Sequence, residues 1–201
     1  MRCDVAVVGA GAAGIAAAVA AAEAGAKVVL VERQGFTGGL ATTALVGTIC
    51  GLFYRYPSIA RYAVEGFARE FADAVQVASQ THAVRFGEGL HFLPYRPAAF
   101  HQVAVNRLQQ AGVQLLLHGT VSGITLNRGQ IRELRIQTQM QVLNLYPAAI
   151  ASARVIGTCL STGYAAGCLA AEFSDTGIWQ TAIKKICQRQ IAAHSAVSSY
   201  S

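Results

Sequence analysis

The sequence has few charged residues: Asp and Glu number 10, Lys and Arg number 16, and together they make up 13% of the 201 residues. That share is about half of what an ordinary soluble domain carries. It excludes a disordered chain, a coiled coil and a helical protein whose surface is covered by ion pairs. Because hydrophobic residues make up 53% of the chain, we expect much of its surface to lie under a second domain, a partner or a large ligand.

Acidic residues are scarcer than basic ones, which gives a net charge of +6. The excess reflects missing acids rather than a basic patch, since the one local cluster is Lys184, Lys185 and Arg189. No aromatic residues are interleaved with this cluster. We therefore expect a solvated helix face and no nucleic-acid partner.

Paired cysteines and metal-ligand spacings are also missing. Cys3, Cys50, Cys159, Cys168 and Cys187 are odd in number, and no two have the CxxC spacing. The five histidines likewise lack the spacing of metal ligands. These absences argue against a disulfide framework and a zinc site, and they fit a reducing compartment.

One uncharged run, residues 5–22, has the length of a membrane span. It is dominated by alanine and glycine, with one isoleucine and no leucine or phenylalanine, so its insertion into a bilayer is poorly favoured. Asp4 stands where a signal peptide would continue its positive region. We therefore predict a buried segment, no membrane partner and a cytoplasmic location.

The first 34 residues predict a strand–helix–strand unit. Cys3–Val8 is an apolar run of strand length, and Lys27–Glu32 is rich in β-branched residues. Between them, Ile15–Ala24 predicts an alanine-rich helix that Gly25 ends. A strand, a crossover helix and a second strand of this combined length form a right-handed unit with parallel strands. The fold class is therefore α/β with a parallel sheet.

The rest of the chain shows no repeat, no linker and no internal boundary, so we expect a single domain over residues 1–201. Met140–Arg154 cannot be assigned. The other expected elements follow in chain order: a buried loop over 35–57, a helix over Ile59–Gln80, extended segments over Thr81–Pro97, a helix over Ala98–Ala111, strands over Val113–Leu117, Thr120–Leu126 and Gln130–Thr138, a glycine- and alanine-rich stretch over Val155–Phe173 that ends in a helix, and a terminal helix over Ile178–His194.

A glycine-rich turn, Gly9–Gly14, matches the pattern G-x-G-x-x-G between the first strand and its helix. Gly9 allows a tight turn, Gly11 lets a pyrophosphate approach the backbone, and Gly14 lets helix and strand pack closely. The N–H groups at the helix start, around Ala12 and Ala13, are available to phosphate oxygens. Packing alone could also explain three glycines, but the surrounding strand and helix favour dinucleotide binding.

An acidic residue, Glu32, ends the second strand 21 residues after Gly11. Its carboxylate can accept hydrogen bonds from ribose hydroxyls. Arg33 follows it, and a glycine pair comes at Gly38 and Gly39, giving E-R-x-x-x-x-G-G.

With these residues the sequence resembles the FAD-dependent oxidoreductases of the glutathione-reductase-like superfamily. The run Gly38–Thr43 is similar to the GG-x-A-T stretch of a large bacterial branch. The resemblance implies a Rossmann-like FAD-binding domain with a small β-meander, and FAD as the cofactor. It also implies that Gly38, Gly39, Leu40 and Ala41 pass along the cofactor.

Two further segments carry the resemblance. Arg154–Ala171 is similar to the RV-x-x-T-x-x-x-x-G-x-AAG-x-AA segment that ends the FAD domain, which implies a flavin-contacting segment over 154–173. There a helix starting at Thr162 and Gly163 would point its N-terminus at the flavin. The stretch 113–121 is similar to the strand that meets the adenine, which implies a position near the adenine for Val121.

The chain departs from the family in its middle. The family's chains are usually longer, with an apolar strand ending in A-T-G-D-like residues after the meander and a separate substrate domain. We expect both to be missing here, and the catalytic residues stay unassigned.

We therefore expect an FAD-binding oxidoreductase that takes two electrons, as hydride, from a small organic substrate. Two alternatives stay open: a non-catalytic or truncated nucleotide-binding subunit that needs a partner chain, and an NAD-binding dehydrogenase.

A missing substrate domain would also expose apolar residues of the loop, which predicts a homo-oligomer or a second subunit. Otherwise residues 81–97 and the terminal helix would cover this face as a lid. The residues concerned are Leu40, Leu45, Val46, Ile49, Leu52 and Phe53.

Overall fold

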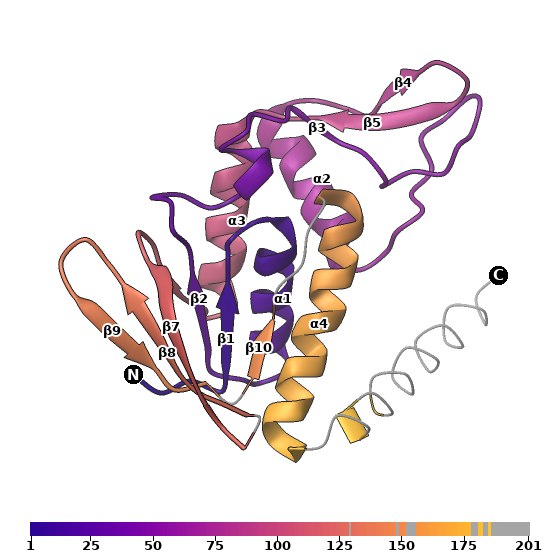
Figure 1. The fold of residues 1–201 in the computed structure, drawn as a ribbon. Helices are drawn as coiled ribbons and strands as arrows, with labels where there is room; N and C mark the ends of the chain where they lie inside the picture. The colour runs from indigo at the N-terminus through magenta and orange to yellow at the C-terminus, as the bar shows by residue number, and fades with distance from the viewer. Residues whose placement is uncertain (129, 148, 152–155, 178–180, 183–184, 186–201) are drawn as a thin grey trace.

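A parallel four-stranded sheet forms the centre of the computed structural model (Figure 1). The structure describes residues 1–128, 130–147, 149–151, 156–177, 181–182 and 185. The sheet has the order β10-β1-β2-β6, with bounds Ala149–Ala151, Val5–Val8, Val28–Val31 and Gln114–Leu116. All three neighbouring pairs are parallel, which confirms the α/β class and the parallel sheet.

The first strand, helix and strand fold as the sequence predicts. Helix α1 spans Ala12–Glu23 and is buried along nearly its whole length. Its alanines leave no polar face, which is the pattern of a helix enclosed on all sides. The register of β1 and β2 pairs Val5 with Val28 and Val8 with Val31. The start of α1 therefore lies at the carboxyl end of the sheet.

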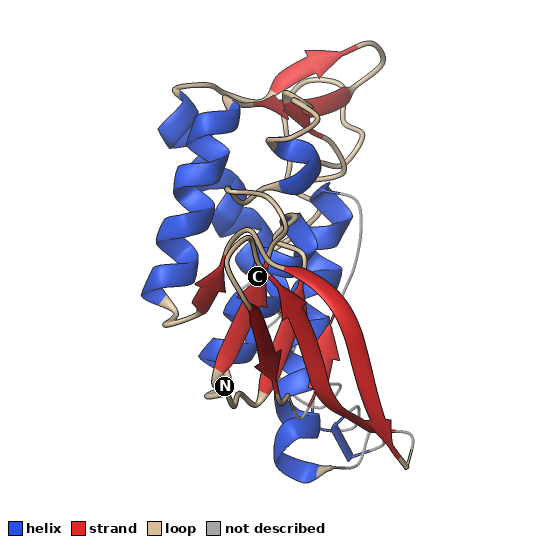
Figure 2. Ribbon diagram, turned by 60° about the vertical axis from the view of Figure 1, so that its left-hand side comes forward, coloured by secondary structure: helices blue, strands red, loops and turns tan. Residues whose placement is uncertain are grey.

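Helices cover one face of the sheet and an antiparallel meander covers the other (Figures 1 and 2). Because side chains alternate along a strand, Val5 and Val7 join the core under the helices, while Ala6 joins a second core under the meander. The helices are α1, α2 (Phe67–Ser79), α3 (Pro97–Gln110) and α4 (Ile156–Thr176), and the meander consists of β7 (Thr120–Asn127), β8 (Gln130–Gln137) and β9 (Val142–Leu145).

A small sheet of order β3-β5-β4 extends from one end of the body (Figure 1). Its strands span Thr48–Ile49, Leu90–Pro94 and Val84–Phe86. The pairing of Ile49 with Leu93 buries both side chains completely. Residues 90–94 thus fold back over the loop that follows the glycine pair.

Helix α2 is shorter than the sequence pattern predicts, since it begins at Phe67 and not near Ile59. The intervening chain forms backbone hydrogen bonds with an earlier segment instead: Tyr54 N–H donates to the Arg61 carbonyl at 2.8 Å and Ala63 N–H to that of Leu52 at 2.7 Å. Ile59 is consequently 59% exposed. Amphipathic spacing alone did not reveal this competing pairing.

The expectation that no strand follows the meander is also wrong. Ala149–Ala151 forms β10, which pairs with β1 through Val5–Ala149 and Val7–Ala151. Three short apolar residues are too few to show strand periodicity, and their pairing with β1 is a tertiary effect. The helix expected over 178–194 lies mostly outside the described residues.

Candidate functional site

The turn between β1 and α1 leaves backbone donors facing outward at the carboxyl end of the sheet. Gly9 has φ of +95°, and its N–H donates to the Val31 carbonyl at 2.7 Å. Gly11 is the N-cap of α1 and provides no side-chain cap. The first intrahelical bond runs from Ile15 N–H to the Gly11 carbonyl at 2.9 Å. The N–H groups of the three preceding residues are therefore oriented for an external anion.

The three glycines of this turn differ in their surroundings. A Cβ at Gly14 would overlap the carbonyl oxygen of Gly9, so position 14 requires glycine for close packing of helix on turn. A Cβ at Gly11 would meet no atom within 4 Å. Gly11 is thus not needed for internal packing, and the space in front of it is open.

Glu32 braces the same turn. Its side chain is buried, with 7% exposed, and Oε2 accepts the Ala10 N–H at 2.7 Å. Oε1 accepts the Gln34 N–H at 2.8 Å. Each carboxylate oxygen has two lone pairs, so both retain capacity for a further donor. The sequence predicted a ligand acceptor here but not the bracing of the turn.

The glycine pair lies against the turn although it comes more than 25 residues later. Gly38 N–H donates to the Ala10 carbonyl at 2.7 Å, and Gly11 and Gly38 form a parallel bridge. A Cβ at Gly39 would lie 3.0 Å from Gly11 Cα. Of the two residues that follow, Leu40 is exposed and Ala41 is fully buried.

A pocket of about 310 Å³ opens beside Glu32. It brings together four residues that the sequence singled out, namely Gly9, Glu32, Arg33 and Val121. Sequence reasoning missed Thr120, whose only signal was its place next to Val121. The full lining is Val8, Gly9, Val31, Glu32, Arg33, Gly119, Thr120 and Val121.

Backbone hydrogen bonds fix the two walls of this pocket to each other. Glu32 N–H donates to the Leu116 carbonyl at 2.8 Å, and Gly119 N–H donates to the Glu32 carbonyl at 2.9 Å. His118 N–H donates to the Gln34 carbonyl at 3.1 Å. The wall that holds Val121 is therefore positioned by the same residue that braces the glycine turn.

Helix α4 begins at Ile156, so the expectation that Thr162 and Gly163 start it is wrong. Both residues lie in its second turn. Gly163 and Gly167 face α1 so closely that a Cβ at either would overlap the carbonyl oxygen of Ala13 or Ala17. Glycine usually weakens a helix, but at positions 163 and 167 it permits the close contact with α1. This contact offsets the weakening, so the two glycines do not interrupt α4. Gly163 consequently lies next to the start of α1.

Tyr95 connects the small sheet to the loop after the glycine pair. Its single hydroxyl proton is shared between the carbonyl oxygens of Ala41, at 3.2 Å, and Val46. Burial raises the pKa of Tyr95 from its ordinary value of 10 to about 12. Tyr95 thus remains a neutral donor at physiological pH and holds this loop in place.

His101, on α3, has a structural role beside Thr37. Its Nδ1 accepts the Thr37 N–H at 3.2 Å and lies 3.0 Å from the Thr37 hydroxyl oxygen. Among the described residues, no three His, Cys, Asp or Glu side chains are grouped to hold a metal ion. Nothing in this geometry assigns a catalytic acid or base.

The loop that was expected to be exposed is only partly so. Leu40, Leu45 and Val46 are exposed at 56%, 70% and 39%. Ile49, which pairs with Leu93 of β5, and Leu52, whose carbonyl accepts the Ala63 N–H, are by contrast fully buried in the main core. The expectation of a fully uncovered face is therefore wrong. Of the expected lid, residues 90–94 pair with β3 at Ile49, and the terminal helix lies mostly outside the described residues.

A family model described as FAD dependent oxidoreductase matches residues 4–150. No curated protein matches the chain. Among the described residues, no helix is both long enough and apolar enough to span a bilayer.

Solved structures with similar folds share 15–19% of their residues with the chain, which at this level shows the fold alone. THI4 from Thermovibrio ammonificans has a TM-score of 0.51 at 19% identity, over 76% of this chain and 57% of that one. OxyS anhydrotetracycline hydroxylase from Streptomyces rimosus has a TM-score of 0.54 at 15% identity, over 75% of this chain and 31% of that one. A geranylgeranyl bacteriochlorophyll reductase-like protein from Thermoplasma acidophilum has a TM-score of 0.52 at 17% identity, over 74% of this chain and 38% of that one. The chain thus spans between about a third and just over half of these structures.

Proposed function

Since this chain belongs to the FAD-dependent oxidoreductase family, we propose that the glycine turn and the neighbouring pocket bind the adenosine and pyrophosphate parts of FAD. The pyrophosphate would lie at Gly11, Ala12 and Ala13, and the ribose at Glu32. The observation that carries the proposal is the pocket where Gly9, Glu32, Arg33 and Val121 meet, although they come from three distant segments.

The residues present fit such a ligand. The uncapped start of α1 offers N–H groups and the positive end of a helix dipole to phosphate oxygens. The open space at Gly11 admits a pyrophosphate against the backbone. Glu32 keeps acceptor capacity for ribose hydroxyls after its two backbone bonds, and Arg33 adds a cation near the phosphates. We propose Gly38, Gly39, Leu40 and Ala41 as the segment that passes beside the ligand.

FAD, when bound, supplies an acceptor for two electrons, taken as a hydride from an organic substrate. The chain's own contribution is to hold the ligand and exclude water around it. Tyr95 anchors residues 41–46 by donating to two carbonyl oxygens. Gly163 lets α4 approach the start of α1, so we propose that Thr162 and Gly163 border the same ligand from the side of α4.

We propose that the substrate-binding part comes from elsewhere, because the chain spans only 31–57% of the three structures described above. In this view residues 1–201 act as one FAD-binding domain, and the exposed Leu40, Leu45 and Val46 meet a second copy or another chain.

A subunit without catalysis of its own is the second candidate. Scattered cysteines support a cytoplasmic location. An NAD-binding dehydrogenase would leave the packing of Gly38 and Gly39 on the turn unexplained.

The absorbance spectrum of the purified chain between about 350 and 500 nm tests the proposal. We expect bound flavin in the native chain and none in Gly11→Val, whose side chain would fill the open space. Stoichiometric FAD in purified Gly11→Val would refute the assignment. Light scattering after size exclusion tests the partner: a monodisperse 21.1 kDa species would contradict self-association.

A further inference from the structure

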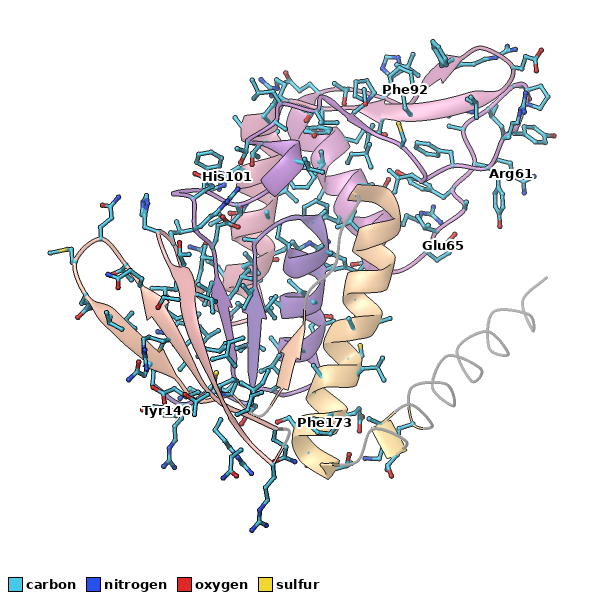
Figure 3. The ribbon with its side chains drawn as sticks, in the orientation of Figure 1. Arg61, Glu65, Phe92, His101, Tyr146 and Phe173 are labelled. Atoms are coloured by element: carbon cyan, nitrogen blue, oxygen red, sulfur yellow. The ribbon has the colours of Figure 1, made fainter. Side chains whose placement is uncertain are left out.

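A second cleft lies at the opposite end of the sheet from the glycine turn. It is about 530 Å³ in volume, within the range of small-ligand pockets. Arg2 and Lys27, which line it, precede β1 and β2 along the chain, so the cleft lies at the amino ends of these strands. Figure 3 shows Tyr146, another lining residue, at the lower end of the body, far from His101 at the upper end. The cleft is therefore separate from the proposed FAD site.

Three cations border this cleft: Arg2, Lys27 and Arg132. Among the described residues none of the three has a carboxylate within 4.0 Å. Asp4 is the single acidic residue of the lining, and its carboxylate accepts the backbone N–H of Lys27 at 2.7 Å. Three cations against one carboxylate leave a net charge of +2. In a chain with only 16 basic residues, this concentration of unpaired charge favours an anionic ligand.

The three other lining residues, Cys3, Tyr146 and Pro147, carry no charge. Cys3 and Pro147 line it from buried positions. Burial, together with the nearby Asp4 carboxylate, raises the pKa of Cys3 to about 11, so its thiol is neutral and not a nucleophile. Tyr146 is 43% exposed and lines the cleft together with the three cations. An aromatic residue together with two uncharged, buried lining residues suits a planar ring.

We propose that this cleft binds a small phosphate monoester that carries a ring, of which a nucleoside monophosphate is the simplest probe. A phosphate monoester carries a charge of about −1.5 to −2 at neutral pH, which balances the lining. Arg2 and Arg132 match phosphate oxygens with their planar forks, and Lys27 adds a point charge. The ring lies against Tyr146. The inference does not rest on the proposed function, because it uses none of the residues of the FAD site.

The test is a calorimetric titration with uridine monophosphate of the chain saturated with FAD, so that the glycine turn cannot take the phosphate. We expect saturable binding that weakens with salt. Uridine and inorganic phosphate should each bind at least about tenfold more weakly, since each lacks half of the contacts. No binding of uridine monophosphate would overturn the proposal. Phosphate alone binding as tightly as the nucleotide would overturn the ring contact.

Variants assign the binding to the cleft. Arg2→Gln and Arg132→Gln should each lower the affinity for uridine monophosphate about tenfold. Tyr146→Ala should lower the affinity for the nucleotide while leaving the affinity for inorganic phosphate unchanged. Arg85→Gln, an exposed cation on β4 in the small sheet, is the matched control and should bind normally. Unchanged affinity in the double variant R2Q/R132Q would refute the site. The same titration of the Gly11→Val variant, which is expected to bind no FAD, makes the result independent of FAD binding.

Discussion

Gly14 packs on Gly9 so closely that a Cβ at position 14 would overlap the Gly9 carbonyl oxygen, whereas a Cβ at Gly11 would meet nothing within 4 Å. Two glycines of one hexapeptide thus serve different purposes. Gly14 is needed by the fold, and Gly11 is needed only if something approaches from outside.

This difference predicts opposite outcomes for two alanine variants. Gly14→Ala should lower the free energy of unfolding by about 1–3 kcal/mol, because backbone must shift to admit the methyl group. Gly11→Ala, at an extended φ of −73°, should unfold like the native chain but bind FAD more weakly. Urea unfolding of the apoprotein and FAD titration measure the two effects. Equal stability of both variants would contradict the prediction.

Glu32→Gln should weaken both the turn and the proposed FAD site. The carboxamide cannot accept the N–H groups of both Ala10 and Gln34, so one buried donor loses its partner at a cost of about 1–3 kcal/mol. FAD affinity should fall by about one to two orders of magnitude.

Glu65→Gln is the control for this variant, since Glu65 is exposed and pairs with Arg69 on the surface. It should change neither quantity by more than about 0.5 kcal/mol. Unaltered FAD affinity in Glu32→Gln would remove the ribose assignment. Unaltered stability would remove the bracing role.

Gly163→Ala should destabilise the chain although alanine is the better helix former. The methyl group would force α4 away from the Ala13 carbonyl, at a cost of about 1–3 kcal/mol that exceeds the gain in helix propensity of about 1 kcal/mol. Gly123→Ala is the control, because its Cβ would have its nearest neighbour, Arg135 Cβ, at an ordinary 3.6 Å. Thermal unfolding compares them, and equal midpoints would rule out the close helix contact.

Tyr95→Phe should change the alkaline limb of the stability curve. The folded-state pKa of Tyr95 is about 12 against an ordinary 10, so above pH 10 the unfolded chain releases a proton that the folded chain keeps. Stability from this group is therefore full below pH 10 and is lost towards pH 12, by roughly 2 kcal/mol.

The variant should unfold more easily at neutral pH, since the Ala41 and Val46 carbonyls lose their donor. Its decline between pH 10 and pH 12 should be shallower than that of the native chain. Denaturant unfolding at several pH values measures both slopes. Parallel curves for the two proteins would refute the buried, protonated state of Tyr95.

The sequence by itself determined the first strand–helix–strand unit. Its apolar strands, its glycine-rich turn and its alanine-rich helix are each visible in a short stretch of neighbouring residues. It also singled out Gly9, Gly11, Gly14 and Glu32 from their residue types and fixed spacing, and their role toward a cofactor stays a prediction. Only the tertiary structure decided what those residues touch. Glu32 proved to brace the Ala10 N–H, and the Gly38 N–H proved to donate to the Ala10 carbonyl.

The tertiary structure also decided where local patterns gave way. The true start of α2 depends on a backbone pairing of residues 61–63 with 52–54, and β10 exists because β1 offers an edge to three short residues. Gly163 stays helical in α4 because α1 lies against it. Each of these outcomes depends on a contact between segments that are distant in sequence. The free energy of such a contact cannot be predicted from the periodicity of either segment alone.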